Sequence, residues 1–203
     1  MAIGPHPHTQ LLENLRAPTH AWSGRIWAHT GCVPAGGAGQ LRCATGDCGG
    51  QLQCGGLGGA TPATLAHVSL HHGGDDQSSY GVSVVDGFNV GLSVTPHEGR
   101  GNCPILACRK DLTQTCPGEL RVRAAASDSV TACKSGCLAF DTDELSCGRN
   151  AYNSRPPATP PPPPKYSDFF KSECPQAFTY AHDSPSLTHQ CSVPRELKVI
   201  FCH

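Results

Sequence analysis

The sequence contains few charged residues and no excess of either sign. Charged side chains make up 15% of the chain, and 15 Lys and Arg nearly balance 16 Asp and Glu, for a formal net charge of −1. Proteins that bind nucleic acid or an anionic membrane surface by electrostatics normally carry a clear basic excess. We therefore expect no nucleic-acid partner and no purely electrostatic attachment to membranes.

Long apolar runs are also missing. No stretch approaches the roughly 20 apolar residues that a membrane-spanning helix needs. The first 20 residues have neither the basic start nor the apolar run of about 7–15 residues that form a secretory signal peptide, because Pro5-His6-Pro7-His8 is followed only by Leu11-Leu12. We expect this segment not to be the native start of the domain, as a mispredicted or alternative first exon would explain.

The 13 cysteines are numerous, yet they lack the spacing of a zinc site. Zinc ribbons and fingers use C-x2-C pairs, and here the closest spacings are Cys133/Cys137, Cys43/Cys48 and Cys103/Cys108. So many cysteines are typical of an oxidising compartment, which favours disulfides over bound metal. Because the count is odd, at least one thiol has no intramolecular partner.

Abundant turn formers and period-two patterns predict a mainly β protein. The 23 Gly and 18 Pro favour turns over helices. Apolar alternation predicts strands over residues 24–30, 64–70 and 197–202, and a hairpin over 80–96 that turns at Asp86-Gly87. Such strands with sparse helices favour a β-sandwich with loop-rich lobes.

Helical signals are short. Residues 129–140 are expected to form a helix that carries Cys133 and Cys137, and Ser167 is a candidate cap for a second helix. Residues 156–164 contain five consecutive prolines, which predict an exposed polyproline-like loop. We interpret it as a tolerated insertion, with docking to an SH3-like groove as the alternative.

Six runs, in order along the chain, resemble the thaumatin-like family, the plant pathogenesis-related proteins that include osmotin and zeamatin. They are residues 24–32, 43–48, 62–66, 85–90, 166–171 and 174–180. The resemblance divides the chain into a non-matching segment, 1–21, and a thaumatin-like domain, 22–203, without the N-terminal strands and with the proline insert. Loss of those strands would leave a sandwich edge uncovered, which favours aggregation.

The resemblance implies a flattened thaumatin-like β-sandwich with two disulfide-rich, loop-rich lobes and short helices. The bridges it implies are Cys32–Cys43, Cys48–Cys54, Cys103–Cys191, Cys108–Cys174 and Cys116–Cys133. Cys137, Cys147 and Cys202 have no family partners here, because the N-terminal segment differs and Ser146-Cys147 replaces a Cys-Cys pair. Cys137 and Cys147 can pair by default, which would leave Cys202 unpaired.

Antifungal members of the family resemble one another in an acidic cleft built from one Arg, one Glu and three Asp. Matched by motif, the Arg falls on His29, the Glu on His67 and the first Asp on Gly81, while Asp86 retains the second. The last Asp is retained if it is Asp183 and lost if it falls on Gln176. These are the candidate cleft residues, and sequence drift at an unused site is the competing interpretation.

The cleft chemistry differs from the family pattern. His29 and His67 would make the cleft cationic in acid, and a metal held by this pair is a weaker alternative. Glycoside hydrolysis needs two carboxyl groups across the scissile bond, and too few remain, so we assign no catalytic residue, cofactor or metal. Asp47, within the run Thr45-Gly46-Asp47-Cys48, is expected to cap turn amides.

The resemblance therefore implies a non-enzymatic, monomeric defence protein of the apoplast or vacuole, active in antifungal and stress responses. Its partners would be fungal wall β-1,3-glucan or membrane components. Two alternatives remain at this stage: a weak β-1,3-glucanase, and an inactive truncated relative. The near-neutral charge argues against the sweet taste of a few basic members.

Overall fold

The computed structural model describes residues 20–36, 40–51, 54–73, 76–124, 127–141, 166–181, 183, 190–192, 194 and 196–201. The expectations for residues 1–19, for the insert at 156–164 and for Cys147 and Cys202 lie outside the described residues. None of the helices in the described part is long and apolar enough to cross a membrane.

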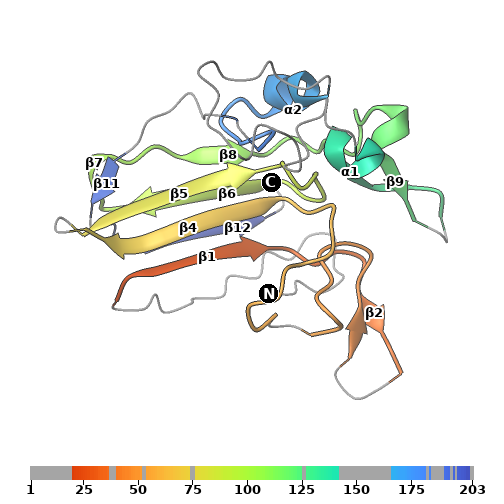
Figure 1. Cartoon of the computed structure of the whole chain (residues 1–203), viewed down its shortest axis with the longest axis horizontal. Coiled ribbons are helices and arrows are strands. Elements are labelled where there is room, and N and C mark those ends of the chain that lie inside the picture. The colour runs from red at the N-terminus through yellow and green to blue at the C-terminus, as the bar shows by residue number, and fades with distance from the viewer. Residues whose placement is uncertain are drawn as a thin grey trace.

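Two antiparallel sheets form the body of the molecule (Figure 1). The larger sheet has the order β1-β4-β5-β11-β7, and the smaller has the order β12-β6-β8. The strands of the larger sheet are β1 (Trp22–Trp27), β4 (Leu65–His72), β5 (Gln77–Ser83), β7 (Arg100–Asn102) and β11 (Gln190–Ser192). Those of the smaller are β6 (Leu92–His97), β8 (Leu106–Cys108) and β12 (Glu196–Phe201). This arrangement confirms the predicted β-sandwich.

The core lies between the two sheets and follows the period-two pattern of the strands. Ala66 and Val82 of the larger sheet meet Leu92, Val94 and Leu106 of the smaller one, and all five are almost fully buried. Alternate residues of each strand face this core. The intervening residues of β4 and β5 are therefore left on the outer face of the larger sheet.

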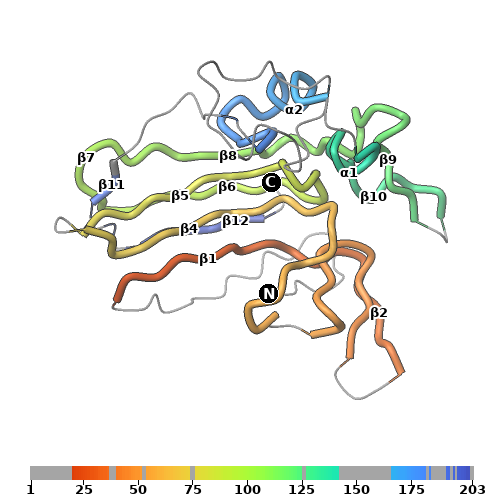
Figure 2. The backbone as a smooth tube through the Cα atoms, in the orientation of Figure 1, coloured from red at the N-terminus to blue at the C-terminus, as the bar shows by residue number. Residues whose placement is uncertain are grey.

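Two smaller lobes flank the sandwich (Figure 2). One contains β2 (Val33–Pro34) paired with β3 (Leu41–Arg42). The other contains the 3-10 helix Gly118–Leu120, β9 (Arg121–Arg123) paired with β10 (Val130–Cys133), and α1 (Gly136–Phe140). The helix α2 (Ser167–Glu173) lies above the smaller sheet in this view.

Five disulfides cross-link the sandwich and its lobes. All five pairings that the resemblance implies are present, with Cys103–Cys191 and Cys108–Cys174 spanning 88 and 66 residues. Cys137 is also disulfide-bonded, and its partner lies outside the described residues. Bridges across such long loops restrict the unfolded chain strongly.

The predicted hairpin over residues 80–96 is wrong. β5 pairs with β4 and β11, whereas β6 pairs with β8 and β12, so the chain passes from one sheet to the other between Ser83 and Leu92. Gly87, with φ of 85°, lies in this crossing, where a Cβ would be 2.7 Å from the Cys133 carbonyl oxygen. Alternation identified the buried faces correctly, but two strands facing one core from opposite sheets give the same pattern as a hairpin.

Two helix predictions also need correction. Residues 130–133 form β10, and only residues 136–140 are helical, because β-branched Val130 and Thr131 extend along β9. Ser135 caps α1, since its hydroxyl accepts a hydrogen bond from the Leu138 amide at 3.3 Å. Ser167 is the first residue of α2 rather than its cap, which is Tyr166 and forms no side-chain cap bond.

Candidate functional site

A groove of about 480 Å³ opens on the outer face of the larger sheet. It crosses β1, β4 and β5, which lie side by side in Figure 2. The side chains in it come from residues whose neighbours along the strand face the core: Ser23 and Arg25, His67 and Ser69, and Ser79. The groove is therefore a direct product of strand alternation and register.

One row of the groove carries hydroxyl groups. Ser23, Ser69 and Ser79 are directly opposite one another on β1, β4 and β5. The Ser23 and Ser69 hydroxyls are hydrogen-bonded at 2.6 Å, and His72 Nε2 is 3.1 Å from the Ser23 hydroxyl. Each hydroxyl can donate and accept, so this row can exchange hydrogen bonds with the hydroxyls of a sugar.

The next row carries charge. Arg25 on β1 is directly opposite His67 on β4, which is opposite Gly81 on β5. Loss of hydration between the strands lowers the pKa of the exposed His67 below 6.5, the nearby Arg25 lowers it further, and Asp86 opposes both. At neutral pH this row therefore contributes one positive charge, and acid adds a second.

An aromatic side chain closes one end of the charged row. Phe178 follows α2 and is fastened along the end of β5, with its amide bonded to the Val82 carbonyl at 2.9 Å and its carbonyl to the Val84 amide at 2.8 Å. Its ring lies against Gly81, where a Cβ would come within 2.9 Å of it. Glycine at this position gives the ring its place at the sheet surface.

Of the four candidate cleft residues, His67 lies in the groove and Asp86 is close by. The Asp86 carboxylate raises the pKa of His67, which places the two within electrostatic reach. Asp86 is not among the residues that line the groove, and its carbonyl oxygen accepts a hydrogen bond from the Ala63 amide at 3.1 Å.

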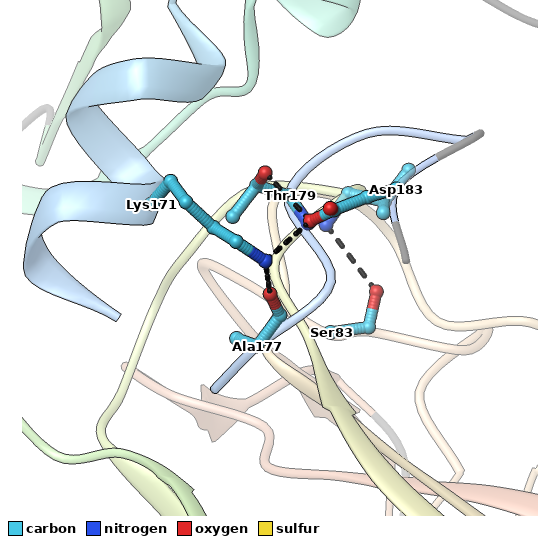
Figure 3. Close-up of polar contacts among 6 residues, drawn as sticks. Ser83, Lys171, Ala177, Thr179 and Asp183 are labelled. Atoms are coloured by element: carbon cyan, nitrogen blue, oxygen red, sulfur yellow. Dashed lines mark hydrogen bonds and ion pairs between the residues drawn. The ribbon is translucent and has the colours of Figure 1, made fainter. Parts of the chain in front are cut away.

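Asp183 is engaged elsewhere (Figure 3). Its carboxylate accepts hydrogen bonds from the Lys171 ammonium at 2.9 Å, the Thr179 amide at 2.9 Å and the Thr179 hydroxyl at 3.0 Å. The Asp183 side chain is only 7% exposed, and Lys171 also donates to the Ala177 carbonyl at 3.1 Å. This carboxylate fastens α2 to the turn that carries Phe178.

His29 lies in the lobe, not in the groove. It is buried beside Trp27, its Nδ1 is 3.8 Å from the Cys43 sulfur, and its Nε2 is 3.9 Å and 3.7 Å from the sulfurs of Cys48 and Cys54. Burial lowers the pKa of His29. These sulfurs belong to disulfides, whereas metals bind thiolates.

Asp47 has the structural role expected of it. Its two carboxylate oxygens accept hydrogen bonds from the Cys43 and Gly50 amides, both at 2.8 Å. These bonds lower the pKa of Asp47, so the cap stays ionised. The Thr-Gly-Asp-Cys run thus shapes the lobe and carries no chemistry of its own.

The described residues of the groove include groups that can bind a ligand, but no pair of carboxyl groups that could act as acid and base. None of the described residues that line it is Asp or Glu. Tyr80 reaches its wall, but burial raises the pKa of Tyr80 to about 12 and its hydroxyl donates to the Pro104 carbonyl at 2.7 Å. The sequence did not indicate Arg25, the serines or Phe178, because the fold that brings them together joins segments up to 155 residues apart.

Comparison with known proteins gives a consistent result. Residues 4–203 match the thaumatin family. An osmotin-like protein of Solanum lycopersicum is 57% identical over 197 residues, which cover 97% of this chain and 76% of that protein. Pathogenesis-related protein 5 of Arabidopsis thaliana is 45% identical over 190 residues, covering 93% and 74%.

A third relative has a name that denotes an activity. It is a glucan endo-1,3-beta-glucosidase of Prunus avium, 40% identical over 182 residues, which cover 89% of this chain and 71% of that protein. The match of the family over nearly the whole length, together with the β-sandwich, leads to one conclusion. The chain belongs to the thaumatin family.

Proposed function

We propose that this protein is a secreted or vacuolar plant defence protein that binds β-1,3-glucan of fungal walls without cleaving it. The observation that carries the proposal is the groove across β1, β4 and β5, with its row of serine hydroxyls and an aromatic ring at one end. Hydroxyls and an aromatic face are the groups that sugars require.

The absence of cleavage follows from the carboxylates. Glycosidases place two carboxyl groups on either side of the bond, one of them protonated. Here Asp183 is held by Lys171 and Thr179, which leaves Asp86 as the one candidate carboxylate near the groove among the described residues. Binding at the wall would concentrate the protein near the fungal membrane, which is the step we propose to precede membrane damage.

Weak glucanase activity is the second candidate, because the Prunus avium relative is named for that reaction. Sedimentation with insoluble β-1,3-glucan, combined with an assay for new reducing ends, separates the two. We expect retention on the glucan and no new reducing ends. Release of sugar would favour the glucanase, and a folded protein that neither binds nor releases sugar would favour an inactive relative.

A blocking variant locates the binding site. Ser69→Trp places an indole in the middle of the groove and should abolish retention. Ser172→Trp is the matched control, because Ser172 is an exposed serine of α2 that does not line the groove, with its hydroxyl bonded to the Phe169 carbonyl. Equal retention of both variants would show that the glucan binds elsewhere.

A further inference from the structure

The groove is cationic as well as hydroxyl-rich, which binding of a neutral glucan does not require. Arg25 and His67 are cross-strand neighbours on the same face of the sheet. Both are exposed, and Arg25 forms no ion pair with any described residue. An exposed arginine that lines the groove without an ion pair to a described residue is a ready site for an anionic group.

The charges around this pair come from three elements. Arg25 faces His67 from β1, the facing residue of β5 is Gly81 and brings no charge, and Asp86 acts from the crossing after β5. Asp86 does not line the groove. An anion between Arg25 and His67 would therefore meet one guanidinium and one imidazole. A second imidazole, that of His72 on β4, lies at the hydroxyl row, where its Nε2 is 3.1 Å from the Ser23 hydroxyl.

The hydroxyl row fixes which kind of anion fits. Ser23, Ser69 and Ser79 lie two residues along their strands from the charged row, a spacing of about 7 Å. A ligand that uses both rows carries its acidic group and its hydroxyls on one small framework, as an acidic sugar does. A bare inorganic anion uses only one row.

We propose that the groove binds saccharides that carry an acidic group, with the anion between the Arg25 guanidinium and the His67 imidazolium and the sugar hydroxyls on the serine row. This inference rests on the proposed function only in taking the groove as a sugar site. It adds a charge preference that a neutral glucan does not reveal.

Binding of this kind is coupled to protonation. Loss of hydration lowers the pKa of His67 most, and Arg25 lowers it further because two positive charges repel each other. An anion between them replaces this repulsion by two attractions, so it raises the pKa of His67 and binds more tightly in acid. By linkage, the gain in affinity on acidification and the rise in the His67 pKa report the same coupling.

The experiment uses the full chain and measures dissociation constants by titration calorimetry at pH 5 and pH 7.5. The probes are trigalacturonate, glucose 6-phosphate, inorganic phosphate and the neutral trisaccharide laminaritriose. We expect trigalacturonate, whose carboxylates stay ionised at both pH values, to bind about threefold to fivefold more tightly at pH 5, the range of one exposed charge pair, and laminaritriose to show no change. Glucose 6-phosphate is compared at pH 7.5, because a phosphate monoester loses charge below a pKa of about 6. The tighter of the two acidic probes identifies whether carboxylate or phosphate is preferred.

Two variants test the assignment of the anion site. Arg25→Gln should weaken acidic-sugar binding at both pH values, and His67→Gln should remove only the gain at pH 5. Arg123→Gln is the matched control, because Arg123 is an exposed arginine of β9 bonded to Asp128. The pKa of His67, followed through its ring NMR resonances, should rise when the acidic sugar is bound. Loss of folding would not produce this change.

The outcomes separate this inference from the proposed function. Binding of laminaritriose with no preference for acidic sugars, or acidic-sugar binding unchanged in Arg25→Gln, would overturn the inference alone. Acidic-sugar binding with no retention on β-1,3-glucan would overturn the proposed function alone. Equal affinity for inorganic phosphate and glucose 6-phosphate, with no trigalacturonate binding, would show that no sugar is recognised and would overturn the inference.

Discussion

Asn89 joins the disulfide lobe to the sandwich, and its removal should be costly. Its side-chain oxygen accepts a hydrogen bond from the Thr64 amide at 3.0 Å. Its nitrogen donates to the Ala28 carbonyl at 3.0 Å and to the Thr45 hydroxyl at 2.8 Å. Asn89 and its partners are all buried, so water cannot readily take its place.

The expected loss follows from these three bonds. Asn89→Ala leaves one buried amide and one buried carbonyl without partners, at about 1–2 kcal/mol each. We therefore expect the free energy of unfolding to fall by about 3 kcal/mol, which corresponds to a decrease in Tm of about 6–12 °C for a chain of this size.

Denaturant unfolding with disulfides intact measures this difference. Gln40→Ala is the control, because Gln40 is an exposed amide residue whose backbone carbonyl, not its side chain, binds the Ala35 amide. A loss below about 1 kcal/mol for Asn89→Ala would refute the reasoning, since it would show that the lobe is held in place by the disulfides and packing alone.

Three further predictions concern stability and the role of single groups. Burial lowers the pKa of His29 below its unfolded value of 6.5, so the free energy of unfolding should be highest above pH 6.5 and fall below that pH by up to about 1.4 kcal/mol per pH unit. The unfolding free energies of wild type and His29→Asn should therefore diverge from pH 7.5 to pH 5, and a constant difference would contradict the burial of a neutral imidazole. Replacing Cys103 and Cys191 by Ala should cost about 4–5 kcal/mol, because the bridge spans 88 residues; an unchanged denaturation midpoint would argue against it. Asp183→Asn should destabilise the protein by about 2 kcal/mol, because it breaks a partly buried ion pair with Lys171. Retention on glucan should be unchanged, and loss of retention in a folded variant would show that this carboxylate takes part in binding.

The strands and the disulfides could be predicted from the sequence for specific reasons. The alternation of Ala66, Val68 and Leu70 identified β4 and its buried face, because a half-buried strand must alternate. The five bridges followed from the resemblance, since cysteine positions relative to the family-like runs indicate the pairing that spacing alone leaves open.

The groove was less accessible, because it depends on register between distant segments. His67 was recognised as a candidate, and the same alternation places Ser69 on its face. Arg25 was not recognised, because only the pairing of β1 with β4 sets it opposite His67. Likewise, the burial of His29 among disulfide sulfurs depends on how the lobe folds, and no pattern around residue 29 indicates it.

The central claim is that the outer face of β1, β4 and β5 binds β-1,3-glucan intact. Backbone NMR during titration with laminarihexaose tests it most directly. The account predicts amide shift changes concentrated at residues 23–25, 67–69 and 79–81, with the oligosaccharide unchanged at the end of the titration. Shift changes centred on Lys171 and Asp183, or appearance of shorter oligosaccharides, would contradict it.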